Sequence, residues 1–87
     1  MSYKQELSTT IYKKFKKLAK KDKVAFEAVA KKVEQILENP HQFKPLRFPM
    51  QGLRRVQIGS FVLTYKIEEA SKTVVLLDYE HHDKVYG

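Results

Sequence analysis

Apolar residues recur at spacings of three and four over residues 9–21, which is the period of one face of an α-helix. Ile11, Phe15 and Leu18 mark this face, and lysines fill most of the remaining positions. Ser8 precedes the pattern and is a residue type that caps helix N-termini. The segment therefore predicts an amphipathic helix with a cationic outer surface.

The same helical period returns over residues 26–37. Asp22 is a natural cap at the start of this second helix, and Asn39 followed by Pro40 ends it, because proline lacks an amide hydrogen and cannot continue a helix. The turn between the two helices is short, so the helices are expected to pack as an antiparallel hairpin.

Alternating apolar and polar residues open the chain, with Tyr3 and Leu7 on one side of the alternation, and predict a brief strand. Residues 41–51 follow the second helix, contain Pro45 and Pro49, and show no regular period. We expect this stretch to be a loop.

Three runs of β-prone residues make up most of the remaining chain, at Leu53–Ile58, 61–67 and 73–79. A tight Gly59-Ser60 turn and a five-residue turn join them, which predicts an antiparallel meander. The third run is continuously apolar at its start, as in a central strand that is covered on both faces.

These elements predict one α+β domain over residues 1–87. The N-terminal strand and the helix hairpin precede a mostly antiparallel sheet that ends in the three-strand meander. If the hairpin packs on one face of this sheet, strand alternation places Arg55, Gln57 and Lys66 on the other face.

Charge adds a class of partner to this picture. The 87 residues include 17 Lys and Arg against 10 Asp and Glu, a net charge of +7. Twelve of the 17 basic residues, but only five of the 10 acidic ones, precede Phe48. This asymmetry favours association with phosphate backbones, acidic proteins or anionic membranes, although lysine-rich helices can also be simply solvated.

Composition also indicates a compartment. The chain has no cysteine, which excludes disulfides and thiolate chemistry and argues against a small secreted protein. Residues 1–10 lack the apolar run of a signal peptide, and no stretch approaches the ~20 apolar residues of a membrane span. We expect a soluble, cytoplasmic protein with no membrane partner.

Several chemistries find no support in the residues. The candidate metal ligands are His41, Glu80, His81, His82 and Asp83, but no two histidines have the i, i+4 spacing that directs both rings at one ion. Adjacent histidines on an extended chain also point in opposite directions, so a metal site is not expected. The serines lack a nucleophile context, and three glycines cannot build a nucleotide-binding loop. The sequence therefore predicts neither a metal nor a small-molecule cofactor.

What remains is a set of cationic and aromatic side chains that suits RNA. Arginine can hold a phosphate through two hydrogen bonds, aromatic rings stack on bases, and histidine or tyrosine can transfer protons. RNA cleavage needs no metal when the 2′-hydroxyl attacks the adjacent phosphate. The members of the set are Lys44, Arg47, Arg54, Arg55, Tyr65, Tyr79, His81, His82, Lys84 and Tyr86.

Three strings in this order resemble the RelE/ParE superfamily of toxins from type II toxin–antitoxin modules, most closely its RelE branch. Residues 44–46 resemble the family's loop, residues 52–65 its arginine-rich strand hairpin ending in tyrosine, and residues 81–86 its histidine-containing tail ending in Val-Tyr. The similarity spans nearly the whole chain and implies a RelE-like fold.

The resemblance implies a toxin that cleaves messenger RNA in the ribosomal A site and so inhibits translation. A cognate acidic, RelB-like antitoxin that folds on binding would neutralise it. Carried onto this sequence, the catalytic candidates are Arg55, His81, His82 and Tyr86. The candidates for binding RNA phosphates are Lys44, Arg47, Arg54, Lys66 and Lys84.

The sequence departs from the family pattern at cationic positions. Gln57 and Val62 stand where the family places arginines, and His82 occupies the arginine position of the tail. Alternatives therefore stay open: a ParE-like gyrase inhibitor, a catalytically weakened toxin that binds RNA or ribosomes, or a domain that interacts only with its antitoxin.

Overall fold

The computed structural model describes residues 2–45 and 52–86, without the side chain of residue 86. The elements are β1 (Lys4–Leu7), α1 (Thr9–Lys21), α2 (Lys23–Glu38), the 3-10 helix η1 (Pro40–Gln42), β2 (Lys44–Pro45), β3 (Leu53–Ile58), β4 (Phe61–Glu68), β5 (Thr73–His81) and α3 (His82–Tyr86). The predicted helices and strands are present in the predicted order, with three short additional elements, η1, β2 and α3.

The described strands form one sheet in the order β1-β5-β4-β3-β2. β3, β4 and β5 make the predicted antiparallel meander, and β1 pairs with β5 in parallel. β5 is thus central where β1 accompanies it, and Val74, Val75 and Leu76 are buried there, as the apolar run predicted.

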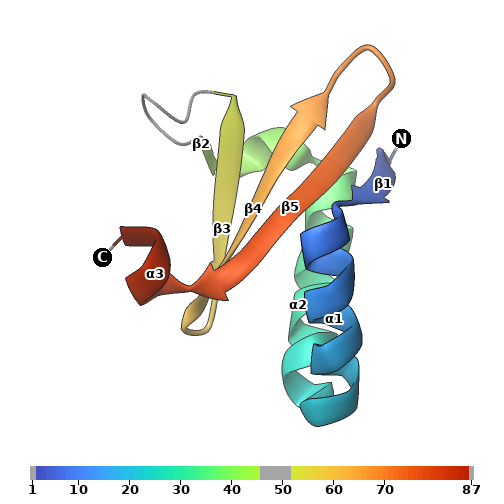
Figure 1. The fold of residues 1–87 in the computed structure, drawn as a ribbon. Coiled ribbons are helices and arrows are strands. Elements are labelled where there is room, and N and C mark those ends of the chain that lie inside the picture. Colours follow the sequence, from blue (N-terminus) through green and yellow to red (C-terminus); the bar gives the residue numbers. More distant parts are fainter. Residues whose placement is uncertain (1, 46–51, 87) are drawn as a thin grey trace.

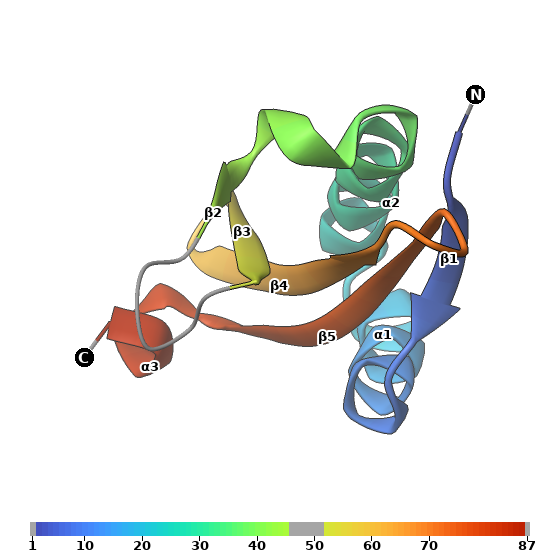
Figure 2. The ribbon, with the colours of Figure 1, turned by 90° about the horizontal axis from the view of Figure 1, so that it is seen from above.

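The helix hairpin is also confirmed. The Ser8 hydroxyl accepts a hydrogen bond from the Ile11 amide at 3.0 Å, and the Asp22 carboxylate accepts one from the Ala25 amide at 3.1 Å. Both caps satisfy amide groups that a helix start leaves unpaired. Figure 1 and Figure 2 show α1 and α2 together on one side of β3, β4 and β5, with α3 on the far side.

The core lies between the helix hairpin and the sheet. Its buried residues come from α1, α2 and the three long strands, so every major element contributes apolar surface. They are Ile11, Val29, Val33, Ile36, Val56, Leu63, Tyr65, Val74, Leu76 and Tyr79.

The loop predicted over residues 41–51 is wrong in its first part. Pro40–Gln42 forms a turn of 3-10 helix, and Lys44–Pro45 pairs with β3 as an edge strand. Proline is compatible with both, since it fits the first turn of a helix and the outer edge of a sheet. The rest of that stretch lies outside the described residues.

Tyr65 anchors this irregular segment to the sheet. Its ring is fully buried, and its hydroxyl donates a 2.6 Å hydrogen bond to the carbonyl of Pro40. Burial raises the pKa of Tyr65 to about 12, so the hydroxyl keeps its proton at neutral pH. Tyr65 therefore has a structural role.

We expect Tyr65→Phe to lower the free energy of unfolding by about 1–3 kcal/mol, because it leaves the buried Pro40 carbonyl without its partner. Tyr12→Phe is the matched control, since Tyr12 is 55% exposed and should change stability by less than about 0.5 kcal/mol. Urea unfolding followed by circular dichroism measures both. Equal values for the two variants would contradict the role given to the Tyr65 hydroxyl.

Glu69, in the turn between β4 and β5, joins three segments that are far apart in sequence. Its carboxylate accepts hydrogen bonds from Lys72 Nζ at 2.9 Å and Tyr3 Oη at 3.0 Å, and lies 2.6 Å from His41 Nε2. The bonds from Lys72, then His41 and Tyr3, lower the pKa of Glu69 to about 2. The carboxylate holds together the residue before β1, the η1 helix and this turn.

This lowered pKa predicts a pH dependence of stability. A carboxyl group whose pKa is lower in the folded chain contributes fully above its unfolded pKa, and the contribution is lost as pH falls from about 4.5 towards about 2. Glu69→Gln should flatten the decline of the melting temperature over that range. Glu27→Gln, at an exposed position on α2, should leave the decline as in the parent chain.

Candidate functional site

The sheet face turned away from α1 and α2 gathers three of the predicted phosphate-binding residues. Lys44 is opposite Arg55 across β2 and β3, and Arg55 is opposite Thr64 across β3 and β4. Directly opposed residues share a face, and Lys66 follows Thr64 by two positions and so shares it too. We name Lys44, Arg55 and Lys66 the cationic face. The predicted position of Arg55 and Lys66 is thereby confirmed.

Arg54 is on the other side of β3 because successive strand residues alternate. Its Nη1 donates to the carbonyl of Phe43 at 2.7 Å and to that of His41 at 3.4 Å. The guanidinium thus fastens the segment before β2 to β3. Arg54 and Arg55 are thus on opposite faces of β3, and their predicted roles in phosphate binding stay predictions.

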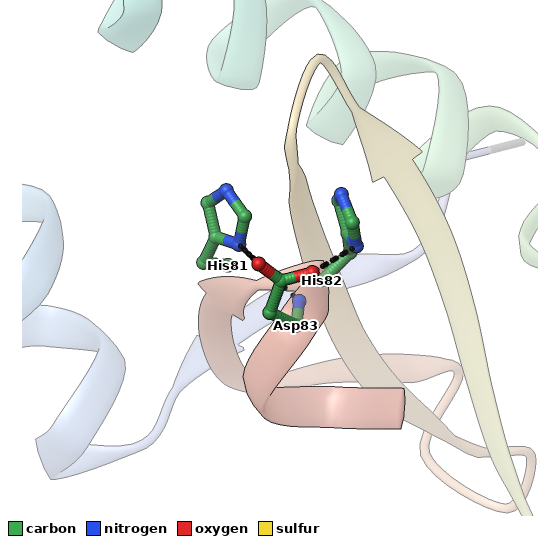
Figure 3. A group of neighbouring side chains, drawn as sticks. All are labelled: His81, His82 and Asp83. Carbon is green, nitrogen blue, oxygen red and sulfur yellow. Dashed lines mark hydrogen bonds and ion pairs between the residues drawn. The ribbon is translucent and has the colours of Figure 1, made fainter. Parts of the chain in front are cut away.

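Two histidines meet where β5 ends and α3 begins. The rings of His81 and His82 stack with centroids 4.7 Å apart and planes at 30°. The Asp83 carboxylate lies between them, with Oδ2 at 3.5 Å from His81 Nδ1 and Oδ1 at 3.1 Å from His82 Nδ1. Figure 3 shows both Nδ1 atoms directed at this carboxylate. We name His81, His82 and Asp83 the histidine cluster.

The expectation that these histidines point in opposite directions is wrong. It assumed an extended backbone, whereas His82 is the first residue of α3 and the chain bends there. Two hydrogen bonds hold the bend: the His82 amide donates to the carbonyl of Ser60 at 2.9 Å, and the Asp83 amide donates to His81 Nδ1 at 3.2 Å. The turn between β3 and β4 therefore positions the histidine cluster.

Aromatic rings support one side of this cluster. His81 contacts Phe61 edge-on with centroids 5.5 Å apart, and Phe61 stacks on Tyr79 at 4.8 Å. Phe61 is 37% exposed and Tyr79 is buried. Phe61 is on the helix-hairpin side of the sheet, opposite to the face of Arg55, and lines a pocket with residues of α1 and α2. A partly exposed ring stacked on a second ring is an arrangement that can stack on an unpaired nucleobase.

Val62 occupies a position where the sequence pattern of the family predicts arginine. It is on the same face as Arg55 but is only 1% exposed. α3 packs against β4 and β5, on the side of the sheet away from the helix hairpin. Val62 therefore contributes apolar packing here, and the neighbouring Gln57 is the exposed residue of the pair.

Three predicted residues remain, and of these only Lys84 has a described side chain. Lys84 is exposed and lies 3.7 Å from Glu80. Arg47 is outside the described residues, and Tyr86 belongs to α3 by its backbone while its side chain is outside them. Their predicted roles stay predictions.

The sequence reading missed the bridging position of Asp83 and an ion-pair cluster around Lys14. Lys14 Nζ lies 2.6 Å from Asp78 Oδ1 and 2.5 Å from Glu80 Oε1, and so ties α1 to β5. The hydrogen bond from Lys14 lowers the pKa of the Glu80 carboxyl. Partners more than 60 residues apart leave no local signal in the sequence. This lysine is not free to bind a polyanion.

Within the described residues no helix is long and apolar enough to cross a membrane.

Comparison with known proteins agrees with this fold. A protein of Methanosarcina mazei is 47% identical over 85 residues, covering 97% of this chain and 99% of its own length. A protein of Methanocaldococcus jannaschii named RelE4 is 42% identical over 85 residues, covering 97% and 90%.

Among solved structures, the RelBE2 toxin–antitoxin complex of Mycobacterium tuberculosis contains a similar chain. The TM-score is 0.79 at 26% identity, and the match covers 93% of this chain and 99% of that one. The model of the ParE toxin of type II toxin–antitoxin systems matches residues 6–86. The chain therefore belongs to the ParE toxin family of type II toxin–antitoxin systems.

Proposed function

We propose that this toxin is a ribosome-dependent, metal-independent mRNA endonuclease that cleaves in the A site and thereby inhibits translation. The observation that carries the proposal is the histidine cluster at the end of a sheet whose outer face bears Arg55. Proton-transfer groups and a phosphate-binding group are what 2′-hydroxyl attack on RNA requires from an enzyme.

In the proposed reaction one histidine of the cluster accepts the proton of the RNA 2′-hydroxyl. At the same time the 2′-oxygen forms a bond to the adjacent phosphorus. The bond from phosphorus to the 5′-oxygen breaks, and the second, protonated histidine gives its proton to that oxygen. The products are a 2′,3′-cyclic phosphate and a free 5′-hydroxyl. Arg55 stabilises the phosphate charge, and the Asp83 carboxylate orients the rings.

The proposed neutralising partner is an acidic, RelB-like antitoxin. The similar chain of Mycobacterium tuberculosis was solved in a toxin–antitoxin complex, and a net charge of +7 favours an acidic partner. Binding to such a partner or to RNA should weaken as salt rises, steeply so where several phosphates are contacted.

A cleavage assay tests the proposal. The purified chain is added to ribosomes stalled on a defined mRNA, and the 5′ ends of the downstream RNA fragments are mapped by primer extension. We expect new RNA ends within the A-site codon even when the toxin has first been treated with EDTA to remove metal ions. We expect none when ribosomes are omitted. Absence of new ends at saturating toxin would overturn the nuclease.

Gyrase inhibition is the second candidate, favoured by the match to the ParE toxin model and by Val62 and Gln57 at the arginine positions. Loss of DNA supercoiling by gyrase in the presence of the chain, without new RNA ends, would support it. Inhibition of translation without either effect would instead indicate a toxin that binds ribosomes and no longer cleaves.

A further inference from the structure

We infer that the histidine cluster binds one transition-metal ion of the zinc type through His81 Nδ1, His82 Nδ1 and the Asp83 carboxylate. The expectation of no metal site rested on histidines that point apart, and the bend at His82 removes that ground. All three ligand atoms lie within 4.8 Å of one another.

The spacing fits tetrahedral coordination. With bonds of about 2.0–2.1 Å, the donor atoms around Zn²⁺ lie roughly 3.3–3.5 Å apart. The carboxylate contacts His81 Nδ1 through Oδ2 at 3.5 Å and His82 Nδ1 through Oδ1 at 3.1 Å, so each distance is close to this edge length although the two involve different oxygens. A small closure of the two rings completes a three-ligand set with one open position.

The donor types select the class of metal. Two imidazoles and one carboxylate suit Zn²⁺, Ni²⁺ and Cu²⁺, whereas Mg²⁺ and Ca²⁺ prefer oxygen donors alone. The His81 and His82 side chains are 40% and 43% exposed and that of Asp83 is 76% exposed, so an ion can enter from solvent. Metal binding must break one contact, the 3.2 Å hydrogen bond that the Asp83 backbone N–H donates to His81 Nδ1.

A bound ion would also regulate the proposed nuclease, an extension that rests on the proposed function. A metal on Nδ1 leaves the proton on Nε2, so the ring can no longer accept a proton from a 2′-hydroxyl. Occupancy of the histidine cluster should therefore inhibit cleavage, and removal of the ion should restore it.

Binding is tested with ZnCl₂ alone on the full chain, by calorimetry and by NMR of the histidine ring signals at neutral pH. We expect one saturating ion per chain, with shifts at His81 and His82 and no competition from excess Mg²⁺. His82→Gln and Asp83→Asn should each weaken binding at least tenfold, while circular dichroism checks that both variants fold. His41→Gln removes a histidine at the other end of the sheet and should bind zinc like the parent chain.

No zinc binding, or equal binding by the parent chain and His82→Gln, would overturn the metal site. The regulatory step is tested separately with two preparations of the chain. One is loaded with zinc and then freed of excess ion, the other is treated with EDTA, and their rates of RNA cleavage are compared. Zinc binding at the cluster with undiminished cleavage would overturn the inhibition. Zinc binding by a chain that never cleaves would support the metal site and contradict the proposed function.

Discussion

Replacing Arg55 by alanine is expected to lower the rate of A-site cleavage about 100- to 1,000-fold, the usual effect of removing one charged contact from a preorganised site. Arg55 is in the middle of the cationic face, between Lys44 on β2 and Thr64 on β4. A guanidinium there can hold a phosphate through two hydrogen bonds, and no uncharged side chain can replace it. Single-turnover cleavage of ribosome-bound mRNA measures the effect.

Lys31→Ala is the matched control for this variant, because it removes one positive charge from an exposed position on α2. It should cleave within about twofold of the parent chain, since exposed charges on another surface act only through long-range, screened attraction. Equal cleavage rates for Arg55→Ala and the parent chain would contradict the proposed role of Arg55 in phosphate binding. Arg54→Ala should behave differently and reduce stability, because Arg54 bonds to the Phe43 carbonyl.

Introducing arginine at position 62 is expected to lower the free energy of unfolding by about 3–5 kcal/mol, a large part of the ~5–15 kcal/mol that stabilises a small domain. Val62 is 1% exposed, so the new guanidinium would be forced into an apolar position without a partner. The family's arginine therefore cannot be restored here by a single substitution. Urea unfolding at neutral pH measures the change.

Gln57→Arg provides the matched comparison at the opposed position of β3, where the residue is exposed. The same side chain there should change stability by less than about 0.5–1 kcal/mol and should strengthen binding to RNA at low salt. If Val62→Arg unfolds at the same urea concentration as Gln57→Arg, Val62 is not the packing residue that its burial indicates.

Local signals account for most of the fold that could be predicted from sequence. Ser8 and Asp22 mark the helix starts because their side chains bond to backbone amides only a few residues away. The strands of the meander were equally readable, since alternation and turn residues act at short range. β2 escaped prediction because two residues carry no period.

The positions of site residues could be predicted only where alternation along a single strand determines which face of the sheet a side chain is on. Alternation along β3 and β4 placed Arg55 and Lys66 on one face without any tertiary information. The paired imidazoles of His81 and His82 required the bend at the start of α3, which depends on the distant carbonyl of Ser60. Likewise, the residues next to Arg54 in the sequence do not indicate that its guanidinium donates a hydrogen bond to the Phe43 carbonyl.

The parallel pairing of β1 with β5 bears on how the protein is made. β1 finds its hydrogen-bonding partners in residues 73–76, and the Ser8 hydroxyl donates to the carbonyl of Leu77, 69 positions later. A growing polypeptide lacks this part of β5 until residues 73–76 have been synthesised, so β1 can join the sheet only after they have emerged from the ribosome. Products whose synthesis stops before these residues should stay unfolded and inactive, so toxicity would be confined to chains that contain β5.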